Sequence, residues 1–180
     1  MHRENRLRSL VAGLLVFAAP LAQAAVTFVL SVEAADDQGR IEQRFAYDAA
    51  GCQGDNLRPA MRWHGAPADT RGFAITVYDP DAKGGWWHWL VLDIPPAVQA
   101  LDEEASLPDA SLVLQNSFGH ARWDGPCPPT ADAAHHYVFT VYALDTDALA
   151  LPANAEPEQA RAMLQRHALA TASVSYVYGR

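Results

Sequence analysis

Two segments of the chain combine carboxylates, imidazoles and aromatic rings at close spacing. The first, residues 78–89, holds Asp79, Asp81 and His88. A short loop rich in proline and glycine joins the apolar runs on either side, which predicts an antiparallel hairpin. In that hairpin Asp79 lies near Trp86, and His88 follows along the same face, so a carboxylate and an imidazole share one end of a sheet. The alternative interpretation is a solvated loop aspartate and a core histidine.

The second segment, residues 123–137, contains a proline-rich loop that leads into a run of strand-forming residues. Three prolines within residues 125–129 remove backbone donors and leave the loop little freedom, so its shape is largely preset. After the loop, strand alternation places His135 and Tyr137 on the same face. The alternative is that His135 and His136 form a solvent-facing pair at the start of the strand.

The elements that must position these side chains are mostly strands. Short runs rich in β-branched and aromatic residues are separated by turns that contain Gly, Pro and Asp, which predicts a mainly β fold. The expected strands cover residues 26–33, 41–47, 73–79, 86–94, 112–115, 137–144 and 172–178. One helix is expected to begin near residue 156, where acidic residues and a proline precede apolar residues at helical spacing up to about Leu169. Many strands and one late helix predict a β-sandwich or barrel with a helical appendix.

The N-terminus has the pattern of a secretory signal peptide. A basic opening precedes an apolar run over residues 10–19, and Ala22-Gln23-Ala24 supplies the small-x-small pattern of a cleavage site. An uncleaved N-terminal anchor is the alternative. We expect a signal peptide over residues 1–24, one domain over residues 25–180, and a periplasmic or secreted protein. Beyond this segment no run is long enough to span a membrane.

The cysteine count and the charge limit the possible functions further. Cys52 and Cys127 allow a single pairing, and the alternatives are a disulfide and two buried thiols. The chain has 13 basic and 21 acidic residues and a net charge of −8, which argues against a nucleic-acid partner. Loss of residues 1–24 would change this charge to −10, since three arginines and one glutamate leave with them.

The two segments resemble the signature regions of the phosphatidylethanolamine-binding protein family, also called Raf kinase inhibitor-like proteins. The first region is matched by Asp79-Pro80-Asp81 and Trp86-Trp87-His88-Trp89. The second is matched by Gly125-Pro-Cys-Pro-Pro129 and His135-His136-Tyr137, with a spelling typical of the bacterial YbhB/YbcL branch. The resemblance covers essentially the whole chain after residue 24. It implies a mainly β fold, an antiparallel β-sandwich with a C-terminal helix.

The resemblance also implies a small anion pocket between the two signature loops. Imidazole and phenol donors suit phosphate oxygens, and the neighbouring tryptophans could shelter an ammonium head group. We expect a non-catalytic, regulatory module that binds a phosphate-bearing or phospholipid head-group ligand, without a cofactor, a catalytic residue or a metal. Carried over by motif, the lining comprises Asp79, Asp81, His88, the backbone around Cys127 and Pro128, His135 and Tyr137.

Two other functions stay open. Two Asp and two His around a phosphate are also the parts of a general acid–base hydrolase or a metal site. The chain lacks a nucleophile elbow, a P-loop and an H-E-x-x-H motif, which disfavours the hydrolase. An inhibitor of a protease or of a kinase pathway is suggested by the family alone, and no protein partner is identified. Exposed edge strands allow a homodimer.

Four residues depart from the family pattern. Lys83 stands in place of a loop proline and His136 in place of an arginine, while Arg58 and Trp123 replace a common Ser and a common Tyr. Lys83 puts in doubt the rigidity of the loop near Asp79. His136 puts in doubt the ion pair that the arginine would make, because histidine is not a constitutive cation.

Overall fold

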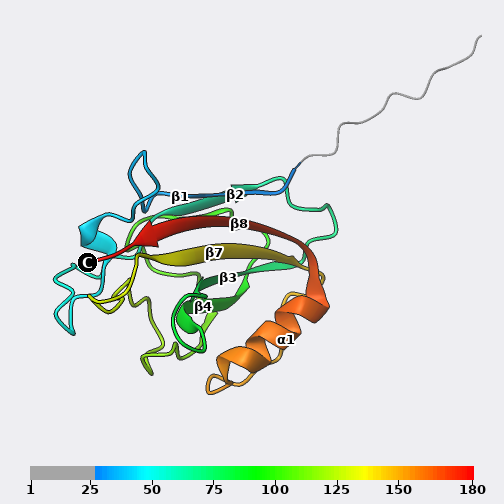
Figure 1. Cartoon of the computed structure of the whole chain (residues 1–180). Coiled ribbons are helices and arrows are strands. Elements are labelled where there is room, and N and C mark those ends of the chain that lie inside the picture. Colours follow the sequence, from blue (N-terminus) through cyan, green and yellow to red (C-terminus); the bar gives the residue numbers. More distant parts are fainter. Residues whose placement is uncertain (1–26) are drawn as a thin grey trace, which may run out of the picture.

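Two antiparallel sheets pack face to face, and one helix covers the outer face of the larger sheet (Figure 1). The computed structural model describes residues 27–180, so the predicted signal peptide lies outside the described residues. The small sheet has the order β1-β2-β5, with β1 Val29–Val32, β2 Met61–His64 and β5 Ala100–Leu101. The large sheet has the order β6-β4-β3-β7-β8, with β6 Leu112–Val113, β4 Trp86–Ile94, β3 Gly72–Asp79, β7 His135–Leu144 and β8 Ala168–Tyr178.

Two apolar layers hold these elements together. Between the sheets lies a core that includes Trp63, Phe73 and Phe139. A second core, with Leu90 and Leu164 among its members, lies between the large sheet and α1 (Pro157–His167). The central strands β3 and β4 are therefore buried on both faces and read as nearly continuous apolar runs. The predicted β-sandwich with a C-terminal helix is confirmed.

The helix begins where the sequence places it. Pro157 occupies the first helical turn, where its missing N–H costs nothing, and the Gln159 side chain accepts a hydrogen bond from the backbone N–H of Glu156 at 2.9 Å. Ala160 and Leu164 are buried against the sheet. The helix ends at His167, and β8 follows at once, four residues earlier than the expected strand at 172.

The expected strand over residues 41–47 is wrong. The chain makes two isolated bridges at the start of this run, Arg40 with Val177 and Ile41 with Ala35, and then turns through the short 3-10 helix η1 (Gln43–Phe45). That turn drives Phe45 into the core, where it is fully buried. The apolar spacing in this run therefore reflects a buried turn. The sequence patterns predicted neither β2 nor β5. Among residues 27–180, no helix combines the length and the apolarity needed to cross a membrane.

The two cysteines form a disulfide. Cys52 and Cys127 are 75 residues apart in sequence, and their Cα atoms are 5.6 Å apart. The bridge ties the segment after η1 to the proline-rich loop before β7, so the loop is fixed by a covalent bond as well as by its prolines.

Candidate functional site

Strands β3, β4 and β7 bring the two signature segments to one end of the large sheet. Because β3 is antiparallel to both neighbours, its C-terminal end lies beside the N-terminal ends of β4 and β7. Asp79 at the end of β3 is in register with Trp86, as the hairpin predicted. His135 and Tyr137 are buried at the start of β7, and the intervening His136 is exposed, which confirms the predicted alternation.

A cavity of about 340 Å³ lies at this end of the sheet. Asp79, His88, Cys127, Pro128, His135 and Tyr137 all line it, so six of the seven predicted residues come together. The seventh, Asp81, does not line this cavity. Trp86, one of the tryptophans expected to shelter a head group, lines it too, whereas sequence reasoning left out the other lining residues, namely Ala82, Lys83, Phe118, Pro129 and Asp132.

The Asp79 carboxylate is fully engaged by its own surroundings. One oxygen, Oδ1, accepts hydrogen bonds from the backbone N–H groups of Asp81 at 2.8 Å and Ala82 at 3.1 Å. The other, Oδ2, accepts from Nδ1 of His135 at 2.7 Å. Asp79 therefore fixes the start of the β3–β4 loop and the orientation of the His135 ring.

Opposing effects act on the His135 imidazole. Burial alone lowers its pKa, but the hydrogen bond from its ring to Asp79 and the nearby negative charges raise it by more, so the pKa of His135 lies above its ordinary value. The second ring nitrogen, Nε2, is 3.6 Å from a carboxylate oxygen of Asp132 at the cavity. Protonation of the ring is thus favoured relative to a free imidazole.

The wild-type protein should owe more of its stability to His135 in acid than in alkali. Relative to a His135→Gln variant, we expect a larger stability advantage at about pH 5.5 than at about pH 8.5. Because the pKa of His135 is higher in the folded protein than in the unfolded chain, protonation of His135 stabilises the fold. This stabilisation is complete below the pKa of the unfolded chain, about 6.5, and is lost as the pH rises through the pKa of the folded protein. Urea unfolding of both proteins at the two pH values measures the difference. An advantage that grows towards alkaline pH would contradict this assignment.

Asp81 anchors the loop from outside the cavity. Its Oδ2 accepts hydrogen bonds from the backbone N–H of His136 at 2.7 Å and from the ring Nδ1 of the same residue at 2.8 Å. These two donors lower the pKa of the Asp81 carboxyl. Although His136 stands in place of an arginine, it still ties the β3–β4 loop to β7, and the neighbouring Lys83 lines the cavity.

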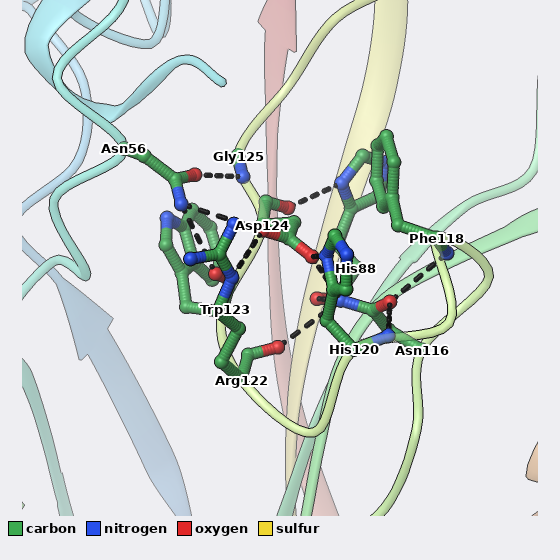
Figure 2. Close-up of polar contacts among 9 residues, drawn as sticks. All are labelled: Asn56, His88, Asn116, Phe118, His120, Arg122, Trp123, Asp124 and Gly125. Atoms are coloured by element: carbon green, nitrogen blue, oxygen red, sulfur yellow. Dashed lines mark hydrogen bonds and ion pairs between the residues drawn. The ribbon is translucent and has the colours of Figure 1, made fainter. Parts of the chain in front are cut away.

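His88 is oriented by a backbone carbonyl (Figure 2). Its Nδ1 lies 2.7 Å from the carbonyl oxygen of Asp124. Because a carbonyl can only accept, Nδ1 carries the proton. The other ring nitrogen, Nε2, is buried and has no hydrogen-bond partner among the described residues. Burial lowers the pKa of His88, so the neutral ring presents a lone pair at Nε2.

A buried polar network holds that carbonyl in place. The Asp124 side chain is fully buried, and four neighbouring side chains donate to it, among them Asn56 through Nδ2 at 3.4 Å (Figure 2). Arg122 Nε donates at 2.9 Å, Asn116 Nδ2 at 2.8 Å and His120 Nδ1 at 2.7 Å. Single-sequence reasoning did not identify this network, because Asp124 lies in the second segment but the side chains that donate to it come from other loops, and the sequence does not show these contacts.

The next residue, Gly125, passes very close to another backbone segment. A Cβ atom at this position would lie 2.0 Å from the carbonyl oxygen of Phe45. Its N–H donates to Asn56 Oδ1 at 2.7 Å. The glycine of the motif is therefore required by close packing of two backbones.

Three polar atoms of the cavity-lining residues have no partner. These atoms are buried and make no hydrogen bond among the described residues: Trp86 Nε1, His88 Nε2 and Tyr137 Oη. Burial, reinforced by the charge of Asp79, raises the pKa of Tyr137, so its hydroxyl stays a neutral donor. Within residues 27–180 no cluster of three or more His, Cys, Asp or Glu side chains is arranged to hold a metal ion. Trp86 Nε1 and Tyr137 Oη can donate, whereas His88 Nε2 accepts, so the arrangement suits an oxygen-rich ligand group that accepts hydrogen bonds and also carries a proton.

Comparison with known proteins agrees with the motifs. The family model described as phosphatidylethanolamine-binding protein matches residues 31–179. The chain is 37% identical to UPF0098 protein YbcL of Escherichia coli, over 94% of this chain and 96% of that protein. It is 33% identical to UPF0098 protein YbhB of the same organism, over 79% and 94% of the two chains.

The crystal structure of Escherichia coli YbcL, described as a new member of the mammalian PEBP family, has the same fold. It superposes with a TM-score of 0.80 at 35% identity and covers 85% of this chain and 98% of that one. The family match, the two relatives and this structure agree on the family and the fold. The chain belongs to the phosphatidylethanolamine-binding protein family.

Proposed function

We propose that the protein binds a small molecule through a phosphate or related oxyanion in the cavity of about 340 Å³. The observation that carries the proposal is the set of three buried, unpartnered polar atoms on Trp86, His88 and Tyr137. A buried polar group without a partner costs about 1–3 kcal/mol, which ligand oxygens would recover, with a protonated oxygen donating to His88 Nε2. Lys83 adds a cation at the cavity, so local groups offset the negative charge of the whole protein.

The cavity also has a place for a positive group on the ligand. Asp132 lines it, is about half exposed, and approaches His135 without a close hydrogen bond. A ligand with a phosphate and an ammonium, such as phosphoethanolamine, would meet donors at one end and this carboxylate at the other.

Binding without catalysis is the proposed mode. Both oxygens of Asp79 already accept hydrogen bonds, and Asp81 is engaged by His136, so neither is free to act as a general base. We also propose a regulatory role, in which binding of the ligand in the cavity is the signal. A hydrolase would instead release inorganic phosphate from phosphoethanolamine, which a phosphorus NMR spectrum of the mixture would reveal.

Titration of the histidine NMR signals tests the proposal. Phosphoethanolamine and inorganic phosphate should each shift the signals of His88 and His135 in a saturable way, whereas ethanolamine alone should not. Exposed His64, on β2, serves as the control signal and should stay in place. Unchanged His88 and His135 signals at millimolar phosphoethanolamine would overturn the proposal, and equal shifts with ethanolamine would indicate a cation site.

Lys83 should strengthen binding by its charge. A Lys83→Ala variant is expected to bind phosphate several-fold more weakly and to lose part of the salt dependence, since an exposed cation acts mainly through screened attraction. Arg166→Ala, which removes an exposed cation from α1, is the matched control and should leave the affinity unchanged. Equal effects of the two substitutions would contradict a local role for Lys83.

We also propose that the protein is periplasmic or secreted. Three observations support this: the signal-peptide pattern of residues 1–24, the disulfide, and a relative whose name contains the word lipoprotein, LppC of Mycobacterium tuberculosis, 39% identical over 110 residues. Cell fractionation followed by N-terminal sequencing would test it, with the mature chain expected to start at Ala25. A chain retained in the cytoplasm with Met1 intact would contradict it.

A homodimer through β8 stays a prediction. Towards its C-terminal end β8 is bridged by Arg40, but residues 168–175 form an outer edge of the large sheet. Pairing of two such edges would extend the sheet across both copies. Size-exclusion chromatography with light scattering over a range of concentrations would show the dimer, and a monomer throughout would dismiss it.

A further inference from the structure

A second cavity, of about 440 Å³, lies on the opposite side of the Asp124 segment. It shares no lining residue with the first cavity. In Figure 2, Trp123, Arg122 and Asn56 lie on one side of Asp124, and His88 lies on the other. The first group lines the second cavity. Its volume is in the range of small-molecule sites.

A buried cation at this cavity makes no close ion pair among residues 27–180. Arg58 is 6% exposed, and its Nη2 donates to the backbone carbonyls of Asp102 at 2.9 Å and Ala105 at 2.6 Å. Its Nη1 is buried and has no partner among the described residues. The carboxylate of Glu104 accepts from the backbone N–H of Arg58, and Glu104 and Asp102 act on the guanidinium through space without forming an ion pair with it. Because arginine stays protonated, this charge is buried without an ion-pair partner in residues 27–180, an arrangement that favours an anion beside it.

Two tryptophans pack beside Arg58, and one of them supplies a second hydrogen-bond donor. The Arg58 guanidinium lies over the Trp89 ring, 5.5 Å from its centroid. Trp89 in turn packs edge-to-face with Trp123 at 6.3 Å, and both indoles are buried. The Trp123 Nε1–H is buried and unpartnered, like Arg58 Nη1. Arg58 and Trp123 are two of the four residues that depart from the family pattern.

The exposed side of the same cavity is acidic. Asp48, Asp55 and Glu104 line it and are exposed, while the cation of Arg122 is paired with Asp124 at 2.9 Å. Three carboxylates would repel a doubly charged phosphate, whereas a single carboxylate accompanied by a cation matches both ends of the cavity.

The geometry points to a second binding site, for a small zwitterion. Its carboxylate would accept hydrogen bonds from Arg58 Nη1 and Trp123 Nε1, and its ammonium would lie at Asp48 and Asp55. Amino acids and short peptides have this chemistry. The site is independent of the proposed phosphate site, because the two cavities have separate linings.

Titration of the tryptophan indole N–H signals with L-lysine tests the inference. The Trp123 indole signal, identified by its loss in Trp123→Phe, should shift downfield in a saturable way as the indole gains an acceptor. Acetate should shift it more weakly, and butylamine should not shift it. The Trp63 indole is the matched control, since it is also buried and unpartnered but lines neither cavity.

An Arg58→Gln variant should weaken lysine binding about tenfold or more, because a hydrogen bond to a charged group is lost. A Trp123 signal that does not move with lysine in the wild type would overturn the inference, and that measurement does not depend on whether the variant folds. A response to inorganic phosphate at Trp123 equal to the response to lysine would overturn the zwitterion assignment.

Discussion

Replacement of Cys52 and Cys127 together by alanine is expected to lower the free energy of unfolding by about 4 kcal/mol. The two residues are 75 apart in sequence, and opening so long a loop restores a large conformational entropy to the unfolded chain. Urea unfolding of the wild type and the double variant, each without reductant, measures the difference.

Reduction of the wild type provides the control for this prediction. Dithiothreitol should bring the wild type close to the double variant and should leave the variant itself unchanged. A loss of less than about 1 kcal/mol in the variant would contradict the expected contribution of the disulfide. Since Cys127 and the prolines after it line the first cavity, we also expect weaker phosphate binding after reduction.

A His88→Asn substitution is expected to weaken phosphate binding about tenfold or more while changing stability little. The asparagine Nδ2 can still donate to the carbonyl oxygen of Asp124, as His88 Nδ1 does at 2.7 Å. The substitution deletes Nε2, the unpartnered ring nitrogen at the cavity. Isothermal titration with phosphoethanolamine measures the affinity, and urea unfolding shows whether the fold is kept.

Phosphate affinity should also rise as the pH falls from about 8 to about 6, where phosphate monoesters gain a proton. Neutral His88 presents a lone pair, so a proton must come with the ligand or be taken up by Nε2 when the ligand binds. Protonation of His135 acts in the same direction. In His88→Asn the slope should become shallower. His64→Asn, at an exposed position on β2, is the control, and an affinity in the wild type that is independent of pH would contradict this account.

Much of the large sheet could be predicted because its long strands contain runs of apolar, β-branched and aromatic residues bounded by turns. In β7, buried His135 and Tyr137 flank exposed His136, and this pattern is visible in the sequence. The hairpin between β3 and β4 followed from its loop, and its register placed Asp79 opposite Trp86. Once these strands were antiparallel neighbours, the two motifs had to meet at one end of the sheet.

The irregular parts could not be predicted in the same way. The apolar spacing around Phe45 is compatible with a strand, and the 3-10 turn is selected by long-range packing. Asp81 belongs to the motif, yet its carboxylate faces His136 outside the cavity, because the loop conformation decides its direction. The Asp124 network and the second cavity depend on side chains from several loops, and a single sequence does not reveal such contacts.

The disulfide also determines what a protease would leave behind. The connection around residues 102–106 is exposed, and it lies inside the loop closed by Cys52 and Cys127. A cut there would produce two fragments that remain covalently joined, so the nicked protein would run as a single species on a denaturing gel until a thiol is added. The proline-rich loop would stay tethered to the segment after η1, and one break in the chain would not release the wall of the cavity.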